Sequence, residues 1–211
     1  LTQGADGNIN IDVDAGNLDV SSVVTANGSG MITLNADAGT VDITAVVSST
    51  TGNIDIDGDI ITQDDDITTG GAGVVTVDAD AGAITMADAT TTTSDTGNIS
   101  YMATTDVALS LLTSTNGALN VTATTGAISD ITNAENANLV TTGTATLMAA
   151  TGIGAAAAAD IDTTIGTLTA TNSTSGDIYV QETSGLIIGG AGVLTQGADG
   201  NINIDVDAGN L

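Results

Sequence analysis

Residues 30–39 read GMITLNADAG: a glycine, then alternating aliphatic and polar residues, then alanines and a second glycine. The same pattern returns at residues 7–16 and 73–82, and looser copies begin at other glycines. The glycines that open the copies are Gly7, Gly30, Gly52, Gly73, Gly97, Gly117, Gly143 and Gly176. A unit that recurs at short intervals indicates a repeat architecture, in which one supersecondary element is copied along the chain.

An aliphatic residue stands two positions after every one of these glycines. In chain order these residues are Ile9, Ile32, Ile54, Val75, Ile99, Leu119, Ala145 and Ile178. The fourth position is apolar as well and the third is mostly polar, and an alternation with a period of two predicts a β-strand with one buried face. We expect all of these side chains to point inward and to stack from one repeat onto the next.

The spacing of the strands predicts how they assemble. A strand begins every 20–26 residues in most of the chain, and a second short alternating run usually follows it. Such a unit fits one turn of a solenoid, called a coil below, that stacks on the next turn. The sequence therefore predicts an all-β fold, a β-solenoid of about eight coils, or nine if Gly166 begins a coil of its own.

The composition narrows the possible functions. The 211 residues include no Phe, Trp, Pro, Cys, Lys, Arg or His, which is very unusual for a globular enzyme. The 26 acidic residues have no basic residue to offset them, and the net charge of −26 disfavours binding to nucleic acid or to an anionic membrane. The expected electrostatic partners are cations. No apolar run approaches ~18 residues, so no membrane insertion is expected.

A long exact repeat predicts the domain organisation. Residues 1–18 recur without a change as residues 194–211, an offset of 193 residues. We therefore expect residues 1–211 to form a single continuous solenoid segment, in which residues 1–193 are one large tandem repeat and residues 194–211 begin the next. Because the chain starts with Leu1 and shows no signal peptide, we expect it to lie inside a longer protein.

Several segments resemble a known family. They are GMITLNADAGTVDI, GNIDIDGDI and the stretch ATGIGAAAAADIDTTIGTLTATNSTSGDIYVQETSGLIIGGAGVL. These segments resemble the repeats of filamentous-haemagglutinin-like giant exoproteins, and the resemblance spans essentially the whole chain. It implies a right-handed parallel β-helix, export to the cell surface, and a role as a fibrous adhesin or stalk.

The seventh position after the opening glycine is acidic in the first four coils. These candidate metal ligands are Asp14, Asp37, Asp59 and Asp80. Coils stack at about 4.8 Å, so adjacent carboxylates would repel by about 0.9 kcal/mol even in bulk water. Bound divalent cations, salt or raised pKa values can answer this repulsion, and carboxylate ligands favour calcium. The alternative is that the side chains spread into water. A second column is expected to hold Asp19, Asp42 and Asp64.

Two other functions fit parts of the sequence. A flat solenoid face that carries Thr-x-Thr arrays can bind ice, and such pairs occur at Thr122/Thr124, Thr144/Thr146 and Thr167/Thr169/Thr171. Threonine is also an ordinary outward strand residue. Paired carboxylates can cleave glycosidic bonds, but this chain has no cationic side chain to stabilise a transition state.

These observations together lead to one expectation of function. We expect a non-enzymatic shaft of an extracellular, cell-surface fibre or giant adhesin, which supplies length and stiffness, with calcium as the candidate stabilising cation. Its expected partner is itself, through end-to-end stacking of coils or lateral contacts between fibres.

Overall fold

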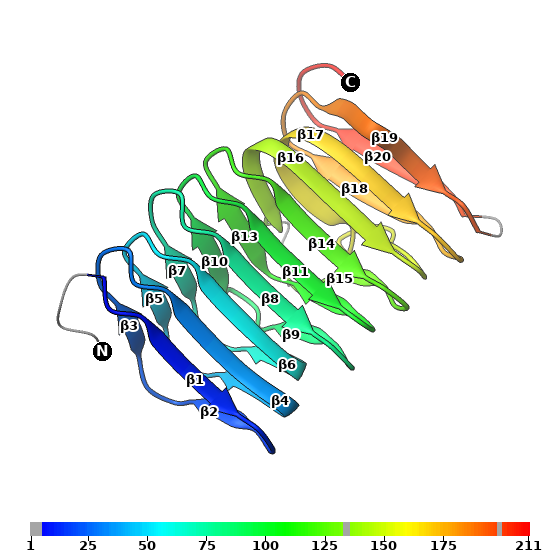
Figure 1. Ribbon diagram of the computed structural model, residues 1–211. Helices are drawn as coiled ribbons and strands as arrows, with labels where there is room; N and C mark the ends of the chain where they lie inside the picture. Colours follow the sequence, from blue (N-terminus) through cyan, green and yellow to red (C-terminus); the bar gives the residue numbers. More distant parts are fainter. Residues whose placement is uncertain (1–5, 133–135, 198–199) are drawn as a thin grey trace.

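The computed structural model describes residues 6–132, 136–197 and 200–211. Within these ranges the chain forms twenty strands and no helix, and every strand pairing is parallel. The strands wind into a rod of about eight coils, with β1 (Ile9–Val13) and β20 (Ile202–Val206) at opposite ends (Figure 1). The predicted all-β parallel β-solenoid is therefore confirmed. None of the described segments is a helix long and apolar enough to cross a membrane.

Each coil contributes strands to three faces of the solenoid. The first face holds β1 (Ile9–Val13), the start of β4 (Ile32–Ile43) and of β6 (Ile54–Gln63), β8 (Val75–Ala79), β11 (Ile99–Ala103), β14 (Leu119–Ala123), the end of β16 (Leu139–Ala149) and of β17 (Ile161–Asn172), and β19 (Ile187–Thr195).

The other two faces are built in the same way. The second face holds β2 (Leu18–Val20), the ends of β4 and β6, β9 (Ile84–Met86), β12 (Val107–Leu109), β15 (Ile128–Asp130), the bridging residue Ile153 and the starts of β18 (Ile178–Glu182) and β20 (Ile202–Val206). The end of β18 pairs with the start of β17, so β18 and β20 continue onto the third face. The third face holds β3 (Val24–Ala26), β5 (Val47–Ser49), β7 (Ile67–Thr69), β10 (Thr91–Ser94), β13 (Leu111–Ser114) and the starts of β16 and β17.

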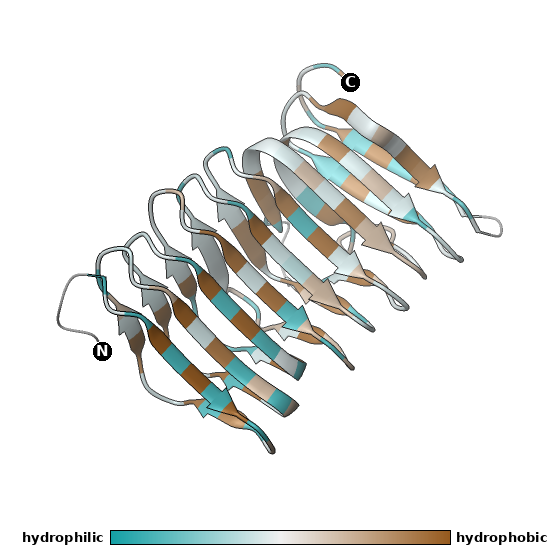
Figure 2. Ribbon diagram, in the orientation of Figure 1, coloured by the Kyte–Doolittle hydropathy of each residue, from teal (hydrophilic) through white to brown (hydrophobic). Residues whose placement is uncertain are grey.

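Stacked aliphatic side chains form the core. Hydrophobic and hydrophilic residues alternate along the first-face strands (Figure 2), and the inward positions align from coil to coil. The first-face ladder runs Ile9, Ile32, Ile54, Val75, Ile99, Leu119, Ala145 and Leu168. The members from Ile32 onward are buried, whereas Ile9 in the first coil is partly buried. Seven of the predicted positions therefore stack as expected.

The eighth predicted position belongs to a different ladder. Ile178 is buried, but it pairs with Ile153 and Ile202 on the second face and not with Ala145. The prediction was wrong here because β17 inserts a further first-face strand, in which Leu168 occupies the expected place. The coil expected to begin at Gly166 is thus present, and Gly176 does not open a first-face strand.

A close approach of backbones explains the column of glycines. A Cβ atom on Gly97 would meet the carbonyl oxygen of Gly73, and a Cβ on Gly117 would meet that of Gly97. Buried hydroxyls bind the same carbonyls: Ser94 Oγ donates to Gly73 O at 2.7 Å, and Ser114 Oγ donates to Gly97 O at 3.0 Å. Glycine recurs at this corner because the coils leave no room for a side chain.

One polar network interrupts the apolar interior. The Tyr101 hydroxyl donates to Gln63 Oε1 at 2.6 Å and lies 2.6 Å from Thr92 Oγ1. Burial raises the pKa of Tyr101, so the phenol is neutral. The three side chains come from the first, second and third faces, and they therefore tie the faces together across the core.

Candidate functional site

The four predicted aspartates lie at one corner of the solenoid. Each follows directly after the last aligned residue of a first-face strand, and these aligned residues are Val13, Ala36, Gly58 and Ala79. The column expected from the sequence, formed by Asp14, Asp37, Asp59 and Asp80, therefore occupies the same corner in four successive coils.

Only two of these aspartates share a cluster of ligand atoms. Carboxylate oxygens of Asp12, Asp14 and Asp37 lie within 4.8 Å of one another, and all three residues are exposed. We call these three residues the acidic cluster. Asp59 and Asp80 do not belong to it. Such a set of hard oxygen ligands is of the kind that calcium uses, but exposed carboxylates also gather without an ion.

An asparagine lies between the carboxylates of the acidic cluster. Asn35 Nδ2 donates to Asp12 Oδ1 at 3.0 Å and to Asp37 Oδ1 at 2.6 Å. A neutral amide thus bridges two carboxylates in adjacent coils and offsets part of their repulsion without an ion. Sequence reasoning missed Asp12 and Asn35, although both stand at the fifth position after a coil glycine, which faces outward.

A second acidic group continues along the same face. Asp57 and Asp78 are aligned in neighbouring coils. Burial raises the pKa of both carboxyls, and among the neighbouring carboxylates Asp80 raises it most in each case. Asp80 therefore interacts with the outward residues of β6 and β8, whereas Asp14 and Asp37 belong to the acidic cluster, so the predicted column is not one continuous group.

The second predicted column is only partly correct. Asp19 is aligned with Asp42, but Asp42 is aligned with Thr62 and not with Asp64. The register shifts after Ala36, because β4 has two more residues at the corner than β6, and Asp64 consequently lies two residues beyond the expected place. Burial raises the pKa of Asp42, and the charges of Asp64 and Asp19 add to this effect.

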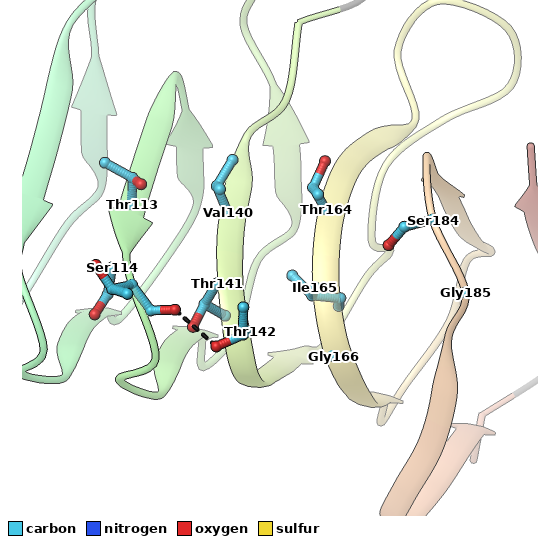
Figure 3. A pocket seen from close by; sticks show the side chains of 11 residues that line it. Thr113, Ser114, Val140, Thr141, Thr142, Thr164, Ile165, Gly166, Ser184 and Gly185 are labelled. Atoms are coloured by element: carbon cyan, nitrogen blue, oxygen red, sulfur yellow. Dashed lines mark hydrogen bonds between the residues drawn. The ribbon is translucent and has the colours of Figure 1, made fainter. Parts of the chain in front are cut away.

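A shallow groove of about 450 Å³ lies over β13, β16 and β17 (Figure 3). Hydroxyl groups, two aliphatic side chains and glycines line it, and Thr142 Oγ1 donates to the Thr115 carbonyl at 2.8 Å along its wall. The lining residues are Thr113, Ser114, Thr115, Val140, Thr141, Thr142, Thr164, Ile165, Gly166, Ser184 and Gly185. None of them carries a carboxylate or another titratable group.

A buried carboxylate lies beside this groove. Glu182 is fully buried and accepts hydrogen bonds from Thr163 Oγ1 at 2.8 Å and from the backbone N–H of Ile165 at 3.0 Å. Ser184 donates both its N–H and its hydroxyl to the other carboxylate oxygen. These four bonds stabilise the corner between the third and first faces, so Glu182 has a structural role.

The threonine pairs form a small array. Thr144 is aligned with Thr167, and Thr146 is aligned with Thr169. In the next outward row Met148 separates Thr122 from Thr171. The array therefore covers two coils and two rows before a half-exposed methionine interrupts it.

Comparisons with protein-family models, with curated proteins and with solved structures find no match to this chain.

Proposed function

We propose that this chain is a structural segment of an extracellular, cell-surface fibre or giant adhesin, in which it serves as the shaft. One observation carries the proposal. β20 repeats the sequence of β1, and it adds to the existing stack by pairing with β18. The second copy of this sequence thus adds a strand to the rod.

The construction of the rod supports this role. A continuous aliphatic core and parallel pairing between every two successive coils make each coil depend on its neighbours, which suits a long and stiff element. The absence of Lys and Arg leaves trypsin-like proteases no site to cut, which suits a location outside the cell. Cations that screen the acidic cluster are part of the proposal.

The length of the rod tests the proposal. The 211-residue chain and a chain with one more 193-residue period should be compared by electron microscopy and small-angle scattering. A shaft lengthens by roughly 38–43 Å for each added period, because eight or nine coils each add about 4.8 Å. Two globular particles joined by a flexible linker would overturn the proposal.

The other two functions have weaker support. An ice-binding face needs a regular lattice of threonines, and Met148 limits the array to two rows. A glycan-cleaving site needs a carboxyl acid and a second carboxylate that reach the substrate. Glu182, the carboxylate beside the groove over β13, β16 and β17, instead accepts hydrogen bonds from the backbone and hydroxyls of its own corner.

A further inference from the structure

The same five residues, INIDV, occupy two different settings in this chain. As β1 (Ile9–Val13) they lie on the first face and pair with β4, which follows them in the chain. As β20 (Ile202–Val206) they begin on the second face and pair with β18, which precedes them. The two copies of the sequence therefore use opposite edges of the strand for their hydrogen bonds.

The outward side chains of the strand have an amide neighbour in each setting. In β1, Asp12 accepts a hydrogen bond from Asn35 of the following coil at 3.0 Å. In β20, the equivalent Asp205 is aligned with Gln181 of the preceding coil, and Gln181 Nε2 donates to Asp207 Oδ2 at 3.0 Å. One INIDV strand thus has a matching amide on each side, and each setting provides only one of the two.

The asparagine that precedes the strand also bonds to a different neighbouring coil in each copy. Asn8 Oδ1 accepts the backbone N–H of Met31 in the following coil at 2.9 Å. The equivalent Asn201 donates its backbone N–H and its Nδ2 to Asp177 Oδ1 of the preceding coil, at 2.7 and 3.1 Å. The side-chain oxygen accepts from the following coil, and the nitrogens donate to the preceding coil. One asparagine can therefore make both sets of bonds at once.

We propose that two copies of the segment of residues 1–211 join end to end through a shared coil. Residues 200–211 of one copy take the place of the identical residues 7–18 of the next copy, and the displaced segment is released. β20 then pairs with its own β18 on one edge and with β4 of the next copy on the other, in the register that β1 has in the single chain. The inference rests on the proposed shaft in requiring end-to-end continuity, and it adds the identity of the joint.

Charge favours this joint over plain stacking of β1 on β20. Direct stacking would set Asp12 against Asp205 and Asp14 against Asp207, and like charges directly opposite each other destabilise a strand pair. In the shared coil Asp205 faces Asn35, which donates to the carboxylate at this position. The side-chain amides of Asn35 on one side and Gln181 on the other therefore favour the shared coil over direct stacking of β1 on β20.

The joint also sets the relative rotation of the two copies. The first face of the next copy continues the side formed by β18 and β20, so each copy is turned about the axis relative to the preceding one. The Leu186 N–H donates to the Asn210 carbonyl, so Leu211, the counterpart of Leu18, is aligned with Leu186, and β2 of the next copy lies over the start of β19. Two large apolar side chains, Ile187 and Ile188, are exposed at this place, and β2 of the next copy stacks on them.

Matched substitutions at the two identical strands test the proposal. Ile204→Asp alters the strand that enters the joint, whereas Ile11→Asp alters the strand that is released. Light scattering and electron microscopy of the wild-type chain should show end-to-end oligomers. Ile204→Asp should leave single particles with an unchanged β-sheet spectrum, and Ile11→Asp should assemble at least as well as wild type. Equal loss of assembly in the two variants, or a wild-type chain that stays monomeric at high concentration, would overturn the shared coil.

Cysteine pairs separate the joint from the shaft function. The natural chain has no cysteine. On oxidation, Asn35→Cys combined with Asp205→Cys should give a ladder of disulfide-linked oligomers, whereas Asp12→Cys combined with Asp205→Cys should give none. The reverse result would overturn the shared coil and leave end-to-end stacking, and with it the proposed shaft, in place. Rods that lengthen with each covalent period while neither pair crosslinks would likewise reject only the joint.

Discussion

Asn35 donates its side-chain amide to Asp12 in the preceding coil, at 3.0 Å between Nδ2 and Oδ1. A second bond from the same nitrogen reaches Asp37 at 2.6 Å. A chain with 26 acidic residues and no basic residue thus uses a neutral amide at the place where carboxylates crowd. The following predictions depend on this and on neighbouring contacts.

Replacing the bridging amide should destabilise the first coils. Asn35→Asp removes both donors and adds a charge between Asp12 and Asp37, so the melting temperature should fall at low ionic strength by about 2–4 °C. About 1 M salt should recover much of the loss, because exposed charges are screened at that concentration. Asn120→Asp, an outward asparagine without these neighbours, is the control. Equal effects of the two substitutions would show that the bridge contributes nothing.

Calcium should stabilise the chain through the acidic cluster. If the ion binds the folded state more tightly, the melting temperature rises with the logarithm of the calcium concentration once the site fills. Asp14→Asn with Asp37→Asn should remove most of this rise. Asp59→Asn with Asp80→Asn removes the same charge outside the cluster and should preserve it. Melting curves that coincide in calcium, chelator and monovalent salt would contradict a calcium site.

The solenoid should be more stable near pH 4 than near pH 7. Burial raises the folded-state pKa of four carboxyls, Asp42, Asp57, Asp78 and Asp160. Such a group binds its proton more tightly in the folded chain, so its contribution to stability is complete below the unfolded pKa of about 3.9 and is lost as the pH rises through the higher folded value. Melting temperatures measured at constant ionic strength check this.

The control for the pH profile removes two of these groups. Asp57→Asn with Asp78→Asn should flatten the profile between about pH 4 and pH 7. Asp6 and Asp177 have lowered pKa values, because Ser29 and Asn201 donate backbone hydrogen bonds to them, and their contribution is lost only as the pH falls further. A melting temperature that decreases steadily from pH 7 to pH 4 would contradict the prediction.

A methyl group at the glycine corner should be poorly tolerated. Gly97→Ala sets a Cβ against the carbonyl oxygen of Gly73, so the stack must open locally, and the cost should be about 1–3 kcal/mol. Gly185→Ala meets its nearest neighbours at 3.4 Å and should change stability by less than about 0.5 kcal/mol. Denaturant unfolding of the two variants measures the difference. Similar values would mean that the close approach is not what requires glycine.

The inward ladder should not accept a charge. Val121→Asp places a carboxylate among fully buried aliphatic side chains and should cost about 3–5 kcal/mol. Thr122→Asp on the same strand faces outward and should cost little. Thermal unfolding followed by circular dichroism compares the two. A mild effect of Val121→Asp would mean that the core is not continuous through β14.

Local alternation was enough to predict the fold class and most of the core. Period two between recurring glycines identifies the strands, and the constant offset of two residues from each glycine, Gly7 to Gly143, to the first inward residue aligns them, because each strand of a solenoid can pair only with its counterparts in adjacent coils. The aspartates that follow these strands fall at one corner for the same reason. Residues near one another in the sequence determine all of these features.

The alignment of residues between adjacent coils depends on the length of each coil, and only the tertiary structure shows it. The extra residues at the β4 corner move Asp64 out of line with Asp42, and the additional strand in β17 puts Leu168 where Ile178 was expected. Only contacts between coils show that Asn35 joins Asp12 to Asp37. The INIDV sequence forms a strand in both of its copies, but its neighbours choose which face and which edge it uses, because alternation specifies an inward side and not the partner on either edge.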